Sequence, residues 1–195
     1  MLRSTALFIL LAALALSAAC DDPFGTLDWP AATAVPDTVE LFSLGRSELL
    51  GLPSAFDLTD QGRRRVVVEQ QGASGAWDIA LVDEAGGLSL MPPGALQGVA
   101  PTSSSGIHVV SGTSFEALER APTDRSAFTD SLTVPLRVGA VYVVRTRPLS
   151  LAFGRCVYHA KLEALEVDVA GGTFLFHYMS NPNCNDPALV PPDDD

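Results

Sequence analysis

The chain has 195 residues, of which 12 are basic and 23 acidic, and its formal net charge is −11 at pH 7. A surface so strongly acidic argues against nucleic acid as a partner. The length favours one folded domain with a sizeable core.

The first nineteen residues have the pattern of an export signal. Arg3 supplies one positive charge, and an uncharged, largely apolar run follows up to Ala19. This run is shorter than the roughly 20 apolar residues of a membrane-spanning helix, so it predicts a signal peptide over residues 1–19. The run ends Leu16-Ser17-Ala18-Ala19-Cys20, which is similar to a lipobox, so we expect cleavage before Cys20 and lipidation of its thiol. An ordinary secretory signal followed by an unrelated cysteine is the alternative.

Composition divides the mature chain into three parts. Residues 20–37 are rich in Pro, Ala, Thr and Asp, which is typical of a linker between a lipid anchor and a folded body. Residues 38–185 are predicted to form the domain. Residues 186–195 end in Pro191-Pro192 and three aspartates, and this composition predicts a solvated acidic tail.

The domain is predicted to be all-β and antiparallel, because short apolar or alternating runs recur about every ten residues between Gly, Pro, Ser and Asp clusters. One helical turn is expected at Ser114–Arg120, with Ser114 as its cap. The predicted strands are Val39–Leu44, Ser54–Leu58, Arg64–Glu69, Trp77–Val82, Ile107–Val110, Leu132–Leu136, Ala140–Thr146, Cys156–Val169 and Thr173–Met179.

The last two strands are predicted to form a hairpin around Ala170-Gly171-Gly172, whose glycines tolerate positive φ. A turn there pairs residues whose numbers add to about 341 or 342, which places Cys156 almost opposite Cys184. Lipidation of Cys20 leaves these two cysteines as a pair in an exported chain. We therefore expect a Cys156–Cys184 disulfide closing the hairpin.

Several short motifs, in order, resemble the HmuY family of haem-binding bacterial lipoproteins. The resemblance covers roughly residues 38–180 and implies an HmuY-like β domain that grips haem between two axial side chains from loops. The motifs that carry it are Phe56-Asp57-Leu58, Ala76-Trp77-Asp78-Ile79-Ala80-Leu81, Val141-Tyr142-Val143-Val144-Arg145-Thr146, Tyr158-His159-Ala160-Lys161-Leu162 and Gly172-Thr173-Phe174-Leu175-Phe176-His177-Tyr178.

The haem ligands that this resemblance implies are sought in the variable stretch of residues 86–131. His108 is the first candidate axial ligand and Met91 the second, since imidazole and thioether are both good donors to haem iron. Arg120 and Arg125 are candidates for pairing with the haem propionates. A strand histidine with a satisfied ring and a core methionine are the alternatives for the first two residues.

The other two histidines, His159 and His177, are not opposite one another in the predicted hairpin, so a shared metal site is not expected. Catalytic signatures are absent from the sequence: there is no nucleophile elbow, no His-Glu-x-x-His and no phosphate-binding Gly loop. Ser103-Ser104-Ser105-Gly106 is typical of a loop. We expect a protein that is not an enzyme.

Two functions remain open from the sequence. One is a lipid-anchored envelope protein that carries haem or a similar hydrophobic ligand. The other is a structural or protein-interaction lipoprotein that keeps the fold without the ligand, with an envelope or outer-membrane protein as its partner. The expected location is the outer membrane, facing either the periplasm or the exterior.

Overall fold

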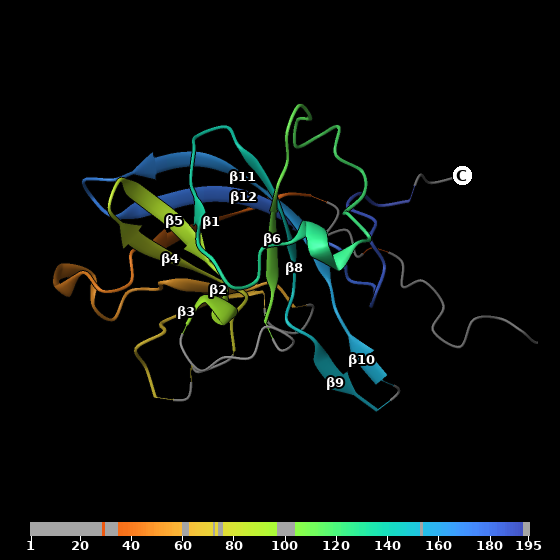
Figure 1. Cartoon of the computed structure of the whole chain (residues 1–195), viewed down its shortest axis with the longest axis horizontal. Coiled ribbons are helices and arrows are strands. Elements are labelled where there is room, and N and C mark those ends of the chain that lie inside the picture. Colours follow the sequence, from red (N-terminus) through yellow and green to blue (C-terminus); the bar gives the residue numbers. More distant parts are fainter. Residues whose placement is uncertain are drawn as a thin grey trace, which may run out of the picture.

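Alternating apolar side chains give antiparallel strands over most of the domain in the computed structural model (Figure 1). The structure describes residues 29, 35–59, 63–71, 73, 76–96, 104–152 and 154–192, and within them the helical segments are all short 3-10 turns. These turns are η1 (Ser47–Leu49), η2 (Pro93–Ala95) and η4 (Arg125–Ala127). The strands are β1 (Asp37–Phe42), β2 (Ala55–Asp57), β3 (Arg64–Val66), β4 (Ile79–Glu84), β5 (Gly87–Met91), β6 (Gly106–Val109), β7 (Val134–Pro135), β8 (Val141–Arg145), β9 (Leu149–Leu151), β10 (Gly154–Cys156), β11 (His159–Asp168) and β12 (Thr173–Ser180).

These strands form two antiparallel sheets and a separate hairpin. The first sheet has the order β1-β12-β11-β8-β6 and the second the order β3-β2-β4-β5-β7, while β9 pairs with β10. The end of β1 joins the two sheets, because Ser43 N donates to Gly172 O and Leu44 N donates to Leu81 O. The all-β, antiparallel fold predicted from the sequence is confirmed.

The main core lies between the two sheets and takes alternate side chains from most of their strands. On β8, Tyr142 and Val144 enter this core, whereas Val141 and Val143 face the other side of the sheet. Phe56 packs edge-on against Phe176 and Tyr178, which joins the second sheet to the first through aromatic contacts.

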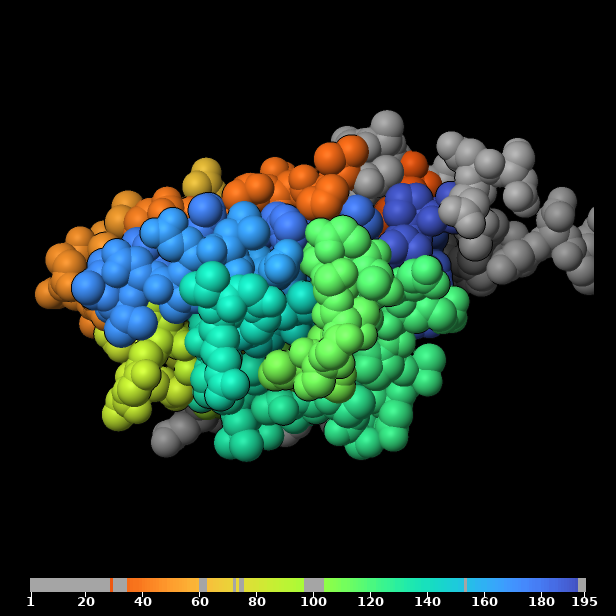
Figure 2. All heavy atoms as spheres, turned by 90° about the horizontal axis from the view of Figure 1, so that it is seen from above, coloured from red at the N-terminus to blue at the C-terminus, as the bar shows by residue number. Residues whose placement is uncertain are grey.

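The outer face of the first sheet is covered at one end by the segment that follows β6. Phe115 packs with Trp29, Val141 and Met179 in one small apolar cluster, and Phe128 packs with Val143 in another. Figure 2 shows this segment, in green, lying against the blue C-terminal strands. Two separate apolar clusters therefore hold the segment on the sheet.

The C-terminal hairpin has the predicted turn, where Gly172 takes a φ of +70°. Next to the turn the paired residue numbers add to 341, as in Asp168↔Thr173, and beyond a bulge at Leu165 they add to 340, as in Ala160↔Ser180. Cys156 and Cys184 continue that second register and form a disulfide with a Cα–Cα distance of 5.3 Å. The predicted disulfide is confirmed.

Other predicted elements differ from the structure in detail. The expected strand Cys156–Val169 is two strands, β10 and β11, and the expected Leu132–Leu136 reduces to β7. The segment Ser114–Arg120 is a turn rather than a helix, although Ala117 N does donate to Ser114 Oγ at 3.3 Å. The packed chain also continues past residue 185, since Leu189 is fully buried and Leu189 N donates to Glu119 O. Residues 186–189 of the predicted tail are therefore part of the packed domain.

Candidate functional site

Met91, the second candidate haem ligand, is a core residue. It ends β5 with only 6% of its surface exposed and packs in an apolar cluster with Trp77, Ala55 and Val66. A thioether enclosed in this way does not fit an axial ligand for haem.

His108, the first candidate, lies on the outer face of β6 and is half-buried. Its Nδ1 lies 2.9 Å from the carbonyl oxygen of Ala127, and its ring centroid lies 6.0 Å from that of Phe128. A hydrogen bond from Nδ1 to a carbonyl selects the tautomer whose Nε2 lone pair is free to bind metal. The Nδ1 of His108 is therefore hydrogen-bonded, as in a structural strand histidine. Its Nε2 keeps the lone pair that a metal ligand needs.

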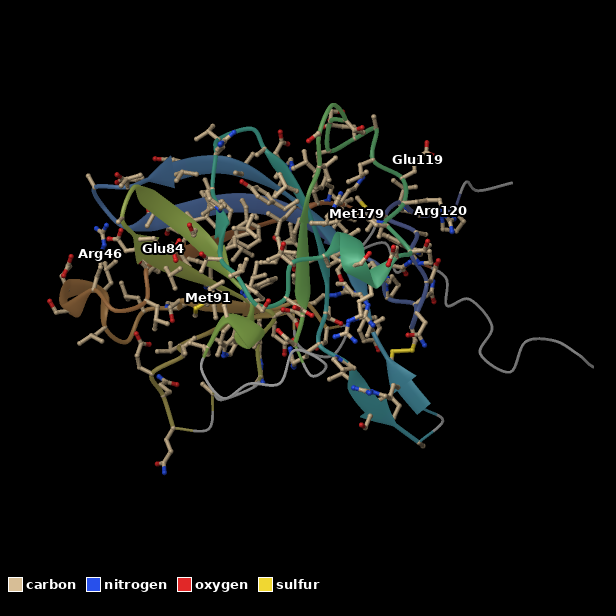
Figure 3. All side chains as sticks on the ribbon, viewed as in Figure 1. Arg46, Glu84, Met91, Glu119, Arg120 and Met179 are labelled. Atoms are coloured by element: carbon tan, nitrogen blue, oxygen red, sulfur yellow. A yellow bond between two sulfur atoms is a disulfide. The ribbon has the colours of Figure 1, made fainter. Side chains whose placement is uncertain are left out.

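The two arginines predicted to pair with propionates are in different surroundings. Arg125 begins η4, the turn whose Ala127 carbonyl oxygen contacts the ring of His108. Its guanidinium lies 3.6 Å from Asp130. Arg120 is exposed and forms a backbone bridge with Ala188. Figure 3 shows Arg120 well separated from Met91. Of the four predicted residues, only His108 and Arg125 are brought to one region.

Arg125 lines a small surface hollow at one end of the first sheet, and the η4 turn that it begins also holds His108 through Ala127. The hollow is lined by Ser104, Ser105, Gly106, Arg125, Phe128, Asp130 and Arg145. Gly106 is required here, because a Cβ at this position would lie 2.7 Å from the Cβ of Phe128. The missing side chain allows Phe128 to close over β6.

Arg145 also lines this hollow, and it was not predicted from the sequence as a site residue. It ends β8 opposite both Gly106 on β6 and His159 on β11. Partial burial, together with the positive charges of Arg125 and Arg155, lowers the pKa of Arg145. The signal was present in the sequence, because the alternation of Val141–Arg145 places Arg145 outward, on the same face as His108 and His159.

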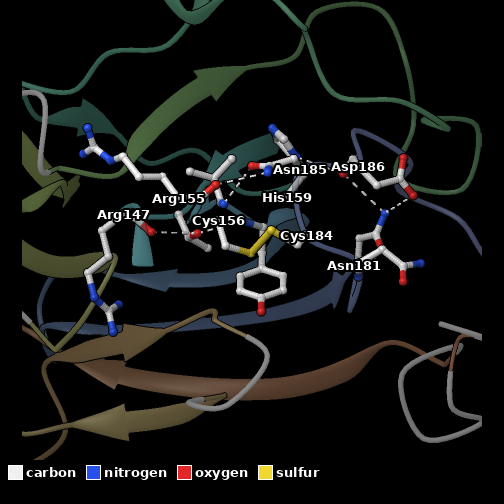
Figure 4. The surroundings of a disulfide bond; sticks show 12 residues. Arg147, Arg155, Cys156, His159, Asn181, Cys184, Asn185 and Asp186 are labelled. Atoms are coloured by element: carbon white, nitrogen blue, oxygen red, sulfur yellow. Dashed lines mark hydrogen bonds between the residues drawn. A yellow bond between two sulfur atoms is a disulfide. The ribbon is translucent and has the colours of Figure 1, made fainter. Parts of the chain in front are cut away.

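The disulfide fixes the backbone that carries Arg155, the third arginine of this region. Val157 N donates to Asn185 Oδ1 at 3.1 Å, Asn185 Nδ2 donates to Arg155 O at 3.1 Å, and Asn185 N donates to Val157 O at 2.8 Å. Figure 4 shows these residues around the Cys156–Cys184 bond, with His159 beside them. The disulfide and these hydrogen bonds together fix the end of β10 against Cys184 and Asn185.

A buried ionic cluster joins the two sheets near the same end of β8. Arg147 donates through both terminal nitrogens to Asp57, at 3.0 and 3.2 Å, and lies 3.1 Å from Asp78. Asp78 also accepts hydrogen bonds from the backbone of Leu58 and of Arg147, both at 2.8 Å. Burial raises the pKa of Asp78 to about 6, although the charge of Arg147 opposes this rise. The pKa of Asp57 is lowered, because hydrogen bonding and charge from Arg147 outweigh the effect of its burial. Both carboxylates therefore pair with Arg147 and accept hydrogen bonds, which is typical of a structural ionic cluster.

Lys161, the only lysine of the chain, is 1% exposed on β11. Its ammonium group donates to the carbonyl oxygens of Phe115 at 2.7 Å and Leu118 at 2.9 Å, and it lies 4.6 Å from the centre of the Phe115 ring. Burial lowers the pKa of Lys161, against the opposing charges of Glu116 and Glu119. This side chain ties the segment after β6 to the sheet.

The remaining predicted features are placed as follows. Cys20 and the signal peptide lie outside the described residues. A membrane-crossing helix is absent from the described part of the chain, and the same residues contain no group of three or more His, Cys, Asp or Glu side chains arranged to hold a metal. Comparison of the sequence and the fold with protein-family models, with curated proteins and with solved structures finds no match. The resemblance to HmuY therefore stays a prediction.

Proposed function

We propose that this protein is a non-enzymatic, lipid-anchored binding protein of the cell envelope, and that it recognises a negatively charged ligand at the hollow between β6, β8 and η4. The proposal is carried by the surroundings of Arg145. Its guanidinium forms no ion pair among the described residues, although the chain has almost twice as many acidic as basic residues. Half-buried positive charge without a partner is costly, which favours a role in binding.

Anchoring is tested by mass spectrometry of the protein extracted from membranes. The expected mature N-terminus is Cys20, carrying acyl chains, and Cys20→Ala is expected to release the protein from the membrane fraction. Cys156→Ala with Cys184→Ala is the matched control, because these cysteines lie in the domain and their loss should leave the protein in the membrane fraction. Recovery of the native protein without acyl chains would contradict lipid anchoring.

Haem is a second candidate ligand, favoured by His108, whose Nδ1 lies 2.9 Å from the carbonyl oxygen of Ala127 in the same turn that Arg125 begins. His108 would hold the iron through Nε2, and Arg125 and Arg145 would pair with the propionate carboxylates. When bound, haem would supply an iron that a neutral imidazole can hold. Met91 does not fit as the partner ligand, so His108 is the one ligand proposed from the residues originally expected to bind.

Haem binding is tested by titrating the mature protein with haemin and following the Soret band. We expect a shift that His108→Ala abolishes and that His177→Ala leaves unchanged, because His177 lies on β12 beside Glu163, with its Nε2 2.9 Å from Glu163 Oε2. An unaltered spectrum for His108→Ala would remove this ligand assignment. Absence of any shift for the wild type would remove haem and leave the binding role to another anionic ligand or to an envelope partner.

A further inference from the structure

Positive charge gathers at the hollow in a chain that is acidic overall. Arg125 and Arg145 line it, and Arg155 lies close enough for its charge to act on Arg145. Three guanidinium groups in one place repel one another, and this repulsion is relieved when an anion lies between them.

Arg145 differs in its ion pairs from Arg147, which lies two residues further along the chain. Arg147 binds two buried aspartates, whereas no described carboxylate lies within ion-pair distance of Arg145. The described acidic residue that lines the hollow is Asp130, and it pairs with Arg125 at 3.6 Å instead. In the hollow, the guanidinium of Arg125 therefore pairs with Asp130, whereas the guanidinium of Arg145 has no ion pair with a described carboxylate.

The lining supplies further hydrogen-bond chemistry. Ser104 Oγ accepts a hydrogen bond from Gly94 N at 2.7 Å, which leaves its own hydrogen available as a donor. Ser105 Oγ donates to the carbonyl oxygen of Asp78, so this hydroxyl is engaged with the backbone. Gly106 pairs with Arg145 across β6 and β8, and Phe128 packs over this glycine and forms an apolar wall of the hollow.

We propose that this hollow is an oxyanion site that takes a phosphate or carboxylate group, with Arg145 as its principal ligand, Arg125 as the second and Ser104 as a hydroxyl donor. A guanidinium fork matches the paired oxygens of either group. Asp130 competes with the ligand for Arg125 and weakens binding. The inference rests on the proposed binding role and names the chemistry of the group bound.

The test is isothermal titration of the mature, detergent-solubilised protein at low ionic strength, with sodium phosphate in one series and sodium succinate in another. The wild type is expected to bind at least one of the two anions, and the series that gives heat identifies the group. Arg145→Gln should weaken binding about ten-fold or more. Arg65→Gln, on the exposed face of β3, is the matched control and should bind as the wild type does.

Asp130→Asn provides the opposite change. It keeps the size of the side chain and removes the competing charge, so it should tighten binding several-fold, and this result does not depend on whether Arg145→Gln folds. Failure of both anions to bind the wild type, or equal binding by the wild type and Arg145→Gln, would overturn the oxyanion site. Phosphate binding through Arg145 without any haemin spectrum would defeat haem carriage and leave this site standing.

Discussion

His159 on β11 lies directly opposite Arg145 on β8, and it is 7% exposed. Its Nδ1 lies 3.0 Å from the carbonyl oxygen of Asp186. Burial lowers the pKa of His159, and the charge of Arg145 lowers it further against the hydrogen bond to Asp186. The cationic group at this end of the sheet is therefore the arginine, while the histidine stays neutral at pH 7.

The pKa of His159 is expected to respond to Arg145. In wild-type protein, proton NMR titration should give a ring pKa below the ordinary 6.5, and Arg145→Gln should move it upward because a positive charge is removed. The depressed value contributes stability that is present above pH 6.5 and is lost as the pH falls from there through the folded-state pKa. Arg65→Gln serves as control. An unchanged His159 pKa in Arg145→Gln would show that the two side chains do not interact electrostatically.

The disulfide is expected to contribute substantially to the free energy of unfolding. The two cysteines are 28 residues apart, and a loop of that length corresponds to roughly 3–4 kcal/mol of chain-entropy stabilisation. Replacing both cysteines by serine should lower the stability measured by urea unfolding by about that amount. The native protein should also show no reactive thiol at these positions in a free-thiol assay. Two reactive cysteines in oxidised native protein would contradict the bond.

Lys161→Met is expected to loosen the segment after β6. Methionine fills much of the same apolar volume but donates no hydrogen bond, so the carbonyl groups of Phe115 and Leu118 lose their partner. We expect a loss of about 1–3 kcal/mol in unfolding free energy and faster amide exchange across residues 113–119. Glu40→Gln changes an exposed carboxylate on β1 and should leave both measurements near wild type. Unaltered exchange in Lys161→Met would show that the apolar clusters alone hold the segment.

Arg46→Lys is expected to destabilise the opposite end of the molecule. Arg46 donates through Nε to Asp83 at 2.8 Å and through its terminal nitrogens to the carbonyl oxygens of Ala170 at 2.8 Å and Val169 at 2.7 Å. A lysine ammonium cannot reach all three groups in this planar arrangement, so we expect a loss of about 1–2 kcal/mol in urea unfolding. Arg65→Lys, at an exposed position, should have no measurable effect. Equal stability of Arg46→Lys and wild type would contradict the role of the fork.

The strands that the sequence predicted well are those with a clear alternation. Val141–Arg145 and the hairpin around Gly172 follow from side chains that alternate between the core and the outer face, and the register of the hairpin follows from its turn. β5 was missed because its Leu-Ser-Leu-Met sequence lies in a Gly- and Pro-rich stretch that reads as a loop, and only pairing with β4 and β7 makes it a strand. Long-range pairing of this kind leaves little local signal.

The candidate site was predicted in part. His108 and Arg125 were named and lie in the same region, while Met91 is in the core, because a thioether before two prolines gives no local indication of what will pack around it. Arg145 was overlooked, since its importance comes from the absence of a carboxylate near it in three dimensions. The partner of a charge depends on how sheets pack, and residue spacing along the chain does not contain that information.

The bulge at Leu165 determines which residue lies opposite Cys156. On the turn side of it the residue numbers add to 341, a register in which Cys156 would lie opposite Asn185, and beyond it the addition of one residue to β11 moves Cys184 into place. Because Leu165 is the unpaired residue of the bulge, its deletion would make Ala164↔Phe176 and Glu166↔Leu175 consecutive pairs of a regular ladder and leave Cys156 opposite Cys184. Relatives of this chain that lack the extra residue are therefore expected to keep the cysteine pair with no compensating change in β12.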